Sequence, residues 1–368
     1  TIIKDEILEI KLKYGDERRT EIIEGEEDFD MEDLIPKEDI VVMCTRGGYM
    51  KRLSIEEYKQ QRRGGKGIIG ADTKEEDVVD HMFTTGTHNT LLLFTDSGRV
   101  HWLKAYRIPS ASRYSKGKAA INLVQLAEDE KITALLPVKT FDERLSVILV
   151  TKNGQIKKTA LKLFSKPRKA GIKSMNLKDK DKLIAARLTP DTLNFILCTK
   201  NGMAVKFRGS DIRRMGRTAG GVRAIRLAPK DEVVGLEVAK SDATVFTITE
   251  NGFGKRTKME NYRLIKRGGK GVRNIKTSER NGCVVGIKTV MDADEILLTS
   301  AKGIVIRVSA GDISLIGRNT QGVRIMRLKG DDKVMCVARI LSQHSNGKKE
   351  EPAEVKNDWW SKIKKSVC

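Results

Sequence analysis

Aromatic residues and long apolar runs are both scarce in this chain of 368 residues. Only 5% of the residues are aromatic, which argues against a stacking platform for single-stranded nucleic acid. No apolar run approaches the roughly 20 residues that a transmembrane helix requires. No apolar leader precedes the first charged residue, Lys4, so a signal peptide is not indicated. These absences predict a soluble protein without a membrane partner.

Cysteine and histidine are also scarce and widely spaced. No two cysteines form a Cys-x-x-Cys pair, and most lie in apolar runs: Cys44, Cys198, Cys283, Cys336 and Cys368. The four histidines have no spacing typical of metal ligands. We therefore predict buried, reduced thiols, a reducing compartment and no metal site.

Acidic residues are outnumbered, and the imbalance is confined to the middle of the chain. The sequence has 70 Lys and Arg residues against 49 Asp and Glu residues, a formal net charge of +21. Residues 1–39 contain 6 basic and 15 acidic side chains, whereas residues 40–341 contain 58 and 30. A positive field of this size attracts phosphate polymers or anionic membrane surfaces.

A glycine-punctuated repeat of about 50 residues fills this basic segment. Six apolar runs each end at a turn glycine: Gly48, Gly98, Gly154, Gly202, Gly252 and Gly303. A second glycine follows 17 or 19 residues later in every unit: Gly67, Gly117, Gly171, Gly221, Gly271 and Gly322. Three of the turns are Asn-Gly, which predicts two-residue hairpins with positive φ at both central residues. Two further alternating or apolar stretches bring each unit to four strands. Six such units predict an all-β, propeller-like disc of stacked blades.

Basic residues recur at equivalent places in the units, which predicts a belt of positive charge around the disc. Five of the six residues located four positions after the turn glycine are basic, Trp102 being the exception: Arg52, Lys158, Lys206, Arg256 and Arg307. Others surround the second glycine: Lys116, Lys118, Arg168, Lys169, Arg217, Arg223, Arg267, Lys270, Arg273, Arg318 and Arg324. The sequence has no recognition helix and no zinc-finger spacing. We expect duplex DNA held by its backbone, although any one of these cations is also compatible with a solvated surface.

The stretch QQRRGGKGIIG, Gln60 to Gly70, contains three cations and four glycines in eleven residues, a composition that fits neither a helix nor a core strand. Its Gly-Gly-Lys is similar to a nucleotide-binding P-loop, but that motif needs Ser or Thr after the lysine, and Gly67 follows Lys66. A solvated turn and a phosphate-contacting loop remain as interpretations. In the second, glycines permit close approach to the duplex and the cations neutralise it.

Seven consecutive residues of this stretch resemble the gyrase box, and the six-unit array resembles the C-terminal domain of the DNA gyrase A protein. The matching residues are Gln61, Arg62, Arg63, Gly64, Gly65, Lys66 and Gly67, with an echo from Lys266 to Gly271. The related topoisomerase IV protein has at most a degraded box, which favours gyrase. The resemblance implies a six-bladed β-pinwheel over residues 40–341 whose blades exchange strands. It also implies positive wrapping of duplex DNA that enables negative supercoiling, with the box in contact with phosphate.

The resemblance further implies that the chain is a fragment. Residues 1–22 resemble the last helix of the cleavage domain, residues 23–39 an acidic linker, and residues 342–368 a tail predicted to be disordered. The cleavage domain with its DNA-linking tyrosine is absent, so we expect no catalysis and no cofactor. ATP and Mg²⁺ would belong to the intact enzyme, an A2B2 assembly with gyrase B in the bacterial cytoplasm at the nucleoid. The isolated domain is expected to be a monomer.

Other interpretations stay open at this stage. A WD-repeat-like propeller that scaffolds proteins is the main one, although Trp-Asp and Gly-His do not recur at repeat spacing. An enzyme built on a propeller would need converging carboxylates or histidines, and none recur. The tail is not acidic as in many members of the family, and its Trp359 and Trp360 fit a docking element, a disordered end or residues added for expression.

Overall fold

A computed structural model describes residues 2–16, 20, 32–45, 47–54, 79–112, 115–190, 192–302 and 304–340. The gyrase-box residues Gln61–Gly67 and the tail, residues 342–368, lie outside the described residues. The chain divides into two compact units, Thr1–Lys37 and Glu38–Cys368. In the described part, no helix is long and apolar enough to cross a membrane.

The first unit contains one helix, α1 (Ile2–Tyr14), with Asp5 in its first turn and Lys11 and Lys13 in its last. These charges complement the helix dipole. This helix occupies part of the segment 1–22 that was predicted to be the helical end of a cleavage domain. The helix ends before Gly15, whose N–H donates to the carbonyl of Lys11 at 2.9 Å, because glycine has a low helix propensity.

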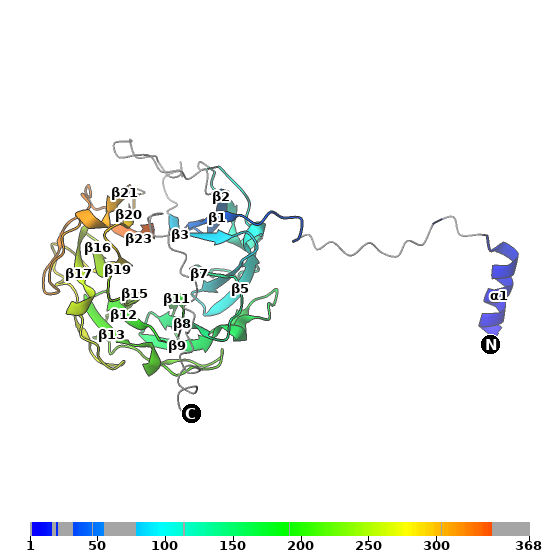
Figure 1. The fold of residues 1–368 in the computed structure, drawn as a ribbon, viewed down its shortest axis with the longest axis horizontal. Coiled ribbons are helices and arrows are strands. Elements are labelled where there is room, and N and C mark those ends of the chain that lie inside the picture. Colours follow the sequence, from blue (N-terminus) through cyan, green and yellow to red (C-terminus); the bar gives the residue numbers. More distant parts are fainter. Residues whose placement is uncertain are drawn as a thin grey trace, which may run out of the picture. The chain divides into compact units, whose positions relative to one another are not determined.

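The second unit consists of six antiparallel sheets, the blades, arranged around a centre as Figure 1 shows. Each of the first five blades has four strands, and the sixth has three among the described residues. From the inner to the outer strand, blade one contains β3 (Val79–Gly86), β1 (Asp39–Thr45), β2 (Tyr49–Ser54) and β6 (Lys118–Ala119). In the same order, blade two contains β7 (Ile132–Val138), β4 (Thr90–Thr95), β5 (Arg99–Lys104) and β10 (Ile172–Lys173). Blade three contains β11 (Leu183–Pro190), β8 (Leu145–Thr151), β9 (Gln155–Ala160) and β14 (Val222–Arg223).

The other three blades repeat this order. Blade four contains β15 (Val233–Val238), β12 (Asn194–Thr199), β13 (Met203–Arg208) and β18 (Val272–Arg273). Blade five contains β19 (Val284–Val290), β16 (Thr244–Thr249), β17 (Phe253–Lys258) and β22 (Val323–Arg324). Blade six contains β23 (Val334–Ile340), β20 (Glu295–Ser300) and β21 (Val305–Ser309). The predicted all-β, six-bladed disc is confirmed.

The outer strand of each four-stranded blade comes from the following repeat unit, the next of the six sequence repeats of about 50 residues. In blade three, for example, Val222 of β14 pairs with Ile156 of β9, and in blade four Val272 of β18 pairs with Ala204 of β13. The strand exchange that the family resemblance implied is therefore confirmed in five blades. Each unit is tied to its predecessor by backbone hydrogen bonds as well as by packing.

The hydrophobic core lies between neighbouring blades. Phe94 of blade two packs in one buried cluster with Val147 of blade three, and Ile148 packs with Phe195 of blade four in the next. The inner strands of neighbouring blades are in contact, including β23 of blade six with β3 of blade one. The predicted stacking of units is confirmed, and burial of Cys44, Cys198 and Cys336 agrees with their assignment as core thiols.

The hairpin turns differ from the predicted type. Gly154, Gly202 and Gly252 have φ near +80°, but among the described residues only Asp129, Lys180 and Lys230 have positive φ without being glycine. The asparagines of the three Asn-Gly turns therefore keep negative φ, and the prediction of two positive φ values was wrong. A type I turn followed by a glycine in the left-handed region forms instead, as in longer hairpin loops. The Thr151 hydroxyl accepts the N–H of Gln155 at 3.1 Å, which stabilises this alternative.

The second glycine allows the following unit to cross the preceding blade closely. Gly221 has φ +82°, and a Cβ placed there would lie 2.6 Å from the carbonyl oxygen of Ile156. At Gly271 the corresponding contact, with the carbonyl oxygen of Ala204, would be 2.4 Å. Both glycines directly precede an outer strand. The recurrent spacing between the turn glycine and the second glycine therefore reflects the point at which each repeat crosses to the preceding blade.

Candidate nucleic-acid interface

Each of the five outer strands that the structure describes carries an exposed cation. The five residues occupy the second position of their two-residue strands, except in β6, where the first position is basic: Lys118, Lys173, Arg223, Arg273 and Arg324. Because these strands are the last in their sheets, the side chains lie on the outer rim of the second unit. The rim therefore presents positive charge in five blades.

Rim loops, the segments that lead into the outer strands, add a second row of arginines. Arg217, Arg267 and Arg318 each stand four residues before the second glycine and are half-buried. Arg267 donates from Nη1 to the carbonyl of Arg223 at 3.2 Å and from Nε to the carbonyl of Asp211 at 3.0 Å. These bonds fix the guanidinium against the preceding unit.

Most of the other predicted rim residues are also exposed. Lys116, Arg168, Lys169 and Lys270 lie on the surface with the outer-strand cations. The Lys116 ammonium stands 4.1 Å from the ring centroid of Tyr49. Arg307 is exposed on β21, where its guanidinium pairs with the carboxylate of Glu295.

The predicted belt four residues after the turn glycine is buried in two of the blades. Lys158 is 4% exposed and Arg256 is 5% exposed. Lys158 Nζ donates to the carbonyl of Gly209 at 2.9 Å, and Arg256 Nε to that of Ile313 at 3.0 Å. Both partners belong to the following unit. This burial argues against phosphate contact, so Lys158 and Arg256 are corrected from surface contacts to links between units.

Lys206 and Arg52 occupy the same position and are half-buried. Lys206 Nζ donates to the carbonyl of Met259 at 3.0 Å, and burial lowers the pKa of this lysine. The cation thus satisfies a short 3-10 turn, η6 (Met259–Asn261), of the next unit. The recurrent cation at this sequence position therefore has a structural role.

Sequence reasoning missed several rim cations that share simple offsets. Lys173 stands two residues after the second glycine, and three exposed residues stand five after it: Arg226, Lys276 and Arg327. Two buried residues, Ala224 and Ile225, separate Arg223 from Arg226, so strand alternation alone does not place Arg226 on the surface. Arg113 has the same offset before Gly117 as Arg217 has before Gly221, but it lies outside the described residues.

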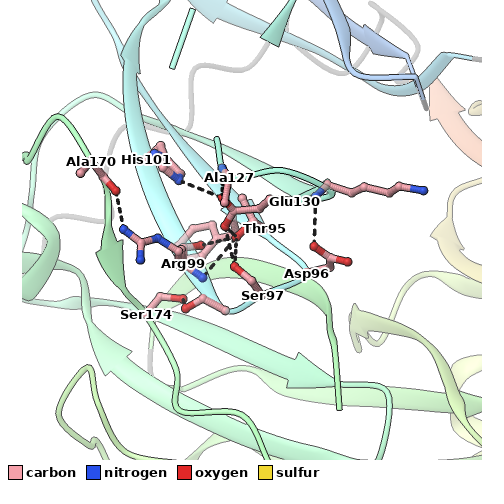
Figure 2. Close-up of polar contacts among 12 residues, drawn as sticks. Thr95, Asp96, Ser97, Arg99, His101, Ala127, Glu130, Ala170 and Ser174 are labelled. Atoms are coloured by element: carbon pink, nitrogen blue, oxygen red, sulfur yellow. Dashed lines mark hydrogen bonds and ion pairs between the residues drawn. The ribbon is translucent and has the colours of Figure 1, made fainter. Parts of the chain in front are cut away.

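Blade two contains a buried polar cluster around Glu130, shown in Figure 2. The carboxylate accepts hydrogen bonds from Thr95 Oγ1 and Ser97 Oγ, both at 2.5 Å, and lies 3.8 Å from His101 Nε2. Burial raises the pKa of Glu130, but the hydrogen bonds from Ser97, Thr95 and the Ala127 N–H, together with the nearby His101, outweigh burial and lower it overall. Burial lowers the pKa of His101, which favours the neutral imidazole.

The position of Glu130 explains this cluster without catalysis. Glu130 stands two residues before an inner strand, as Asp181, Asp231 and Asp332 do. Those aspartates accept the N–H of the residue before the turn glycine, at 2.9 to 3.1 Å. Glu130 closes its turn through Ser97 instead. Across the residues that the structure describes, no three His, Cys, Asp or Glu side chains gather as a metal site would require.

Comparison with known proteins places these features in a family. The family model described as DNA gyrase C-terminal domain, beta-propeller, matches six segments that correspond to the six blades: residues 39–85, 89–139, 146–190, 194–240, 243–291 and 294–339. The chain belongs to this family. Membership in the gyrase C-terminal domain family decides against the WD-repeat alternative.

Individual relatives agree with this membership. The chain is 46% identical over 344 residues to the DNA gyrase A protein of Clostridium acetobutylicum, covering 94% of this chain and 41% of that protein. It is 48% identical over 362 residues to the corresponding gyrase protein of Halalkalibacterium halodurans, covering 98% and 44%. The chain therefore spans less than half the length of these curated relatives.

Solved structures with the same fold include two related domains. A DNA gyrase A C-terminal domain matches with a TM-score of 0.70 and 30% identity, covering 83% of this chain and all of that one. The C-terminal domain of DNA topoisomerase IV matches with a TM-score of 0.70 and 26% identity, covering 83% and 94%.

Proposed function

We propose that this chain binds duplex DNA along its outer rim, without reading bases, and bends the duplex around the disc. The observation that carries the proposal is the exposed Lys or Arg on each of the five outer strands. Equivalent positions in successive blades give a curved row of charge, which matches a bent backbone better than a straight one. The names of the gyrase relatives support the same partner.

The number of rim cations is sufficient for bending. Bending about 40 base pairs through about 180° costs about 11 kcal/mol for an elastic rod with a persistence length of about 150 base pairs. At about 1 kcal/mol each, about ten phosphate contacts offset this cost. The outer strands and rim loops supply enough exposed or half-buried cations: Lys116, Lys118, Arg168, Lys169, Lys173, Arg217, Arg223, Arg267, Lys270, Arg273, Arg318 and Arg324.

The proposal extends to the larger protein that the relatives represent. We propose that the wrap has positive handedness and presents DNA to a gyrase A cleavage domain working with gyrase B in an A2B2 assembly. Catalysis, ATP and Mg²⁺ would then belong to that assembly, in the bacterial cytoplasm at the nucleoid. The isolated chain would be a non-catalytic monomer.

Two matched double variants test the rim. Arg223→Ala/Arg273→Ala removes two outer-strand cations, and Lys139→Ala/Lys240→Ala removes two exposed cations from the connections that follow inner strands β7 and β15. Both variants lower the net charge equally. Mobility shifts with random-sequence duplex should show binding weakened about tenfold or more by the rim variant and little changed by the control. Equal weakening by both would mean that net charge, and not the rim, binds DNA.

A further inference from the structure

Three blades bury a lysine in the strand that faces the rim loop. Lys51, Lys157 and Lys255 each stand three residues after the turn glycine, in blades one, three and five. Lys157 and Lys255 are 0% exposed and Lys51 is 4% exposed. In blades two and four the same position is occupied by His101 and Val205.

Each of these ammonium groups binds the rim loop of the following unit. Lys255 Nζ donates to the carbonyls of Gly317 and Arg318, at 2.6 and 2.8 Å, and to Thr320 Oγ1 at 3.2 Å. The ammonium thus binds the loop at Arg318, the residue whose guanidinium lies on the rim.

The arrangement recurs in blade three. Lys157 Nζ donates to the carbonyls of Gly216 and Arg217, and also to that of Ser174. Gly216 and Arg217 occupy the same positions in their unit as Gly317 and Arg318. In blade one, Lys51 Nζ donates to the carbonyl of Ser115 at 2.8 Å.

Blades without the lysine hold the rim loop by other means. In blade two, Arg99 Nη2, at the start of β5, donates to the carbonyl of Ala170. In blade four, the loop arginine Arg267 itself binds the carbonyl of Asp211. The buried ammonium is therefore a specific solution and not a requirement of the blade.

A buried ammonium is a costly way to fill this position. Burial, together with the nearby guanidinium of Arg217, lowers the pKa of Lys157 to about 7. Burial and the guanidinium of Arg318 likewise lower the pKa of Lys255 to about 8, against a small opposing effect of Cys198. Val205 shows that an apolar side chain fits the same strand position. The cation donates directed hydrogen bonds to the loop carbonyls, which an apolar residue cannot do.

We propose that Lys157 and Lys255 are positioning residues of the DNA-binding rim, which hold Arg217 and Arg318 where each meets a phosphate. This inference rests on the proposed function. Neither lysine touches DNA, and each acts through the arginine whose carbonyl it binds.

A double-mutant cycle tests this dependence. Lys157→Met, Arg217→Ala and the combined variant are compared for duplex affinity and for the slope of log affinity against log salt. Lys158→Met, alone and combined with Arg217→Ala, is the matched control. It removes a neighbouring buried lysine that binds Gly209 instead of the rim loop. Circular dichroism and urea unfolding monitor the fold of every variant.

If Lys157 acts through Arg217, each single substitution should weaken binding about fivefold and lower the salt slope by about 0.9. The slope should fall for Lys157→Met although no exposed charge is lost. The combined variant should be no weaker than Arg217→Ala alone. The Lys158→Met variant should keep the wild-type slope.

Additive effects of Lys157→Met and Arg217→Ala, or an unchanged slope in Lys157→Met, would overturn the positioning role while leaving DNA binding intact. Failure of the wild-type chain to bind duplex would instead overturn the proposed function. If Lys157→Met does not fold, Lys255→Met with Arg318→Ala repeats the cycle in blade five. Loss of fold in both methionine variants would assign the lysines to stability and also overturn the inference.

Discussion

The guanidinium Nη1 of Arg318 donates a hydrogen bond to the carbonyl oxygen of Arg273, 3.0 Å away. Arg318 belongs to the rim loop of one unit and Arg273 to the outer strand contributed by the preceding unit. Arg267 and Arg223 repeat the relationship one blade earlier, at 3.2 Å. The two rows of rim cations are therefore joined across blade boundaries. Each contact leaves further N–H donors of the guanidinium for a phosphate.

Salt dependence tests the number of phosphate contacts. Affinity for random-sequence duplex should fall steeply with salt, with a log-log slope of magnitude about 6 to 10, because each neutralised phosphate releases counterions. Fluorescence anisotropy across a salt series measures this slope. A magnitude below about 3 would leave too few contacts to offset the bend.

The second glycine should be intolerant of a side chain. Gly221→Ala places a Cβ 2.6 Å from the carbonyl of Ile156 at φ +82°. Urea unfolding should show a loss of about 2 kcal/mol or more in the free energy of unfolding, because the left-handed region alone costs about 1–2 kcal/mol for a non-glycine residue.

Gly216→Ala is the matched control in the same rim loop, since nothing lies within 4 Å of the position that its Cβ would take and its φ is not in the positive range. This variant should stay within about 0.5 kcal/mol of wild type. Equal effects of the two substitutions would show that the close crossing at Gly221 does not govern stability.

The blade count was predictable from the sequence, because backbone positions with positive φ favour glycine and therefore recur visibly in each repeat. The offsets to Gly171, Gly221 and Gly271 located a strand after each second glycine, but the position of that strand at the outer end of the preceding blade came from the structure. The turn type was not predictable from Asn-Gly alone, since the preceding threonine hydroxyl stabilises a longer loop. For Thr199 this bond to the N–H of Met203 is 3.2 Å.

The direction of basic side chains was predictable only in part. Arg223 and Lys158 look alike as recurrent cations, yet one is exposed and the other is buried. Long basic side chains can be buried when carbonyls accept their hydrogen bonds, and those carbonyls come from the next unit. A pattern within one unit cannot indicate partners supplied by another, which is also why Lys157 and Lys255 were not singled out.

Stability should depend on pH through the buried lysines. The pKa of Lys157 in the folded chain is about 7 and that of Lys255 about 8, both below the ordinary value of 10.5. Between these values and 10.5 the unfolded chain binds more protons than the folded chain, so the free energy of unfolding should rise with pH. Urea unfolding at about pH 6.5 and about pH 9.5 measures this rise in the free energy of unfolding.

Lys157→Met/Lys255→Met should flatten this dependence, because the groups that lose protons on folding are gone. A wild-type chain whose stability falls over the same range, or a variant with an unchanged rise, would contradict the burial of these two ammonium groups.

The chain alone should neither hydrolyse ATP nor nick plasmid DNA. Lys66 is followed by glycine and not by the hydroxyl residue that a P-loop needs for Mg²⁺. A phosphate-release assay and an agarose gel with supercoiled plasmid check both activities. Turnover that disappears in Lys66→Ala would revive the nucleotide-binding interpretation.

The gyrase-box loop should contribute to the curvature of the bound duplex more than to the fold. Arg62→Ala/Arg63→Ala/Lys66→Ala removes three cations, and surface-type changes within about 0.5 kcal/mol per site are expected for stability. Each lost phosphate contact should lower the salt slope by about 0.9. The remaining rim cations should still hold the duplex, so bending should be affected more than binding.

Linking number tests the wrapping of DNA most directly. Plasmid is relaxed by a type I topoisomerase in the presence of the wild-type chain, the box variant or Arg223→Ala/Arg273→Ala, each at a concentration that gives equal occupancy. The wild-type chain should trap a positive change in linking number, and both variants a much smaller one while remaining folded by circular dichroism. A wild-type chain that saturates the plasmid and leaves its linking number unchanged would contradict wrapping around the rim.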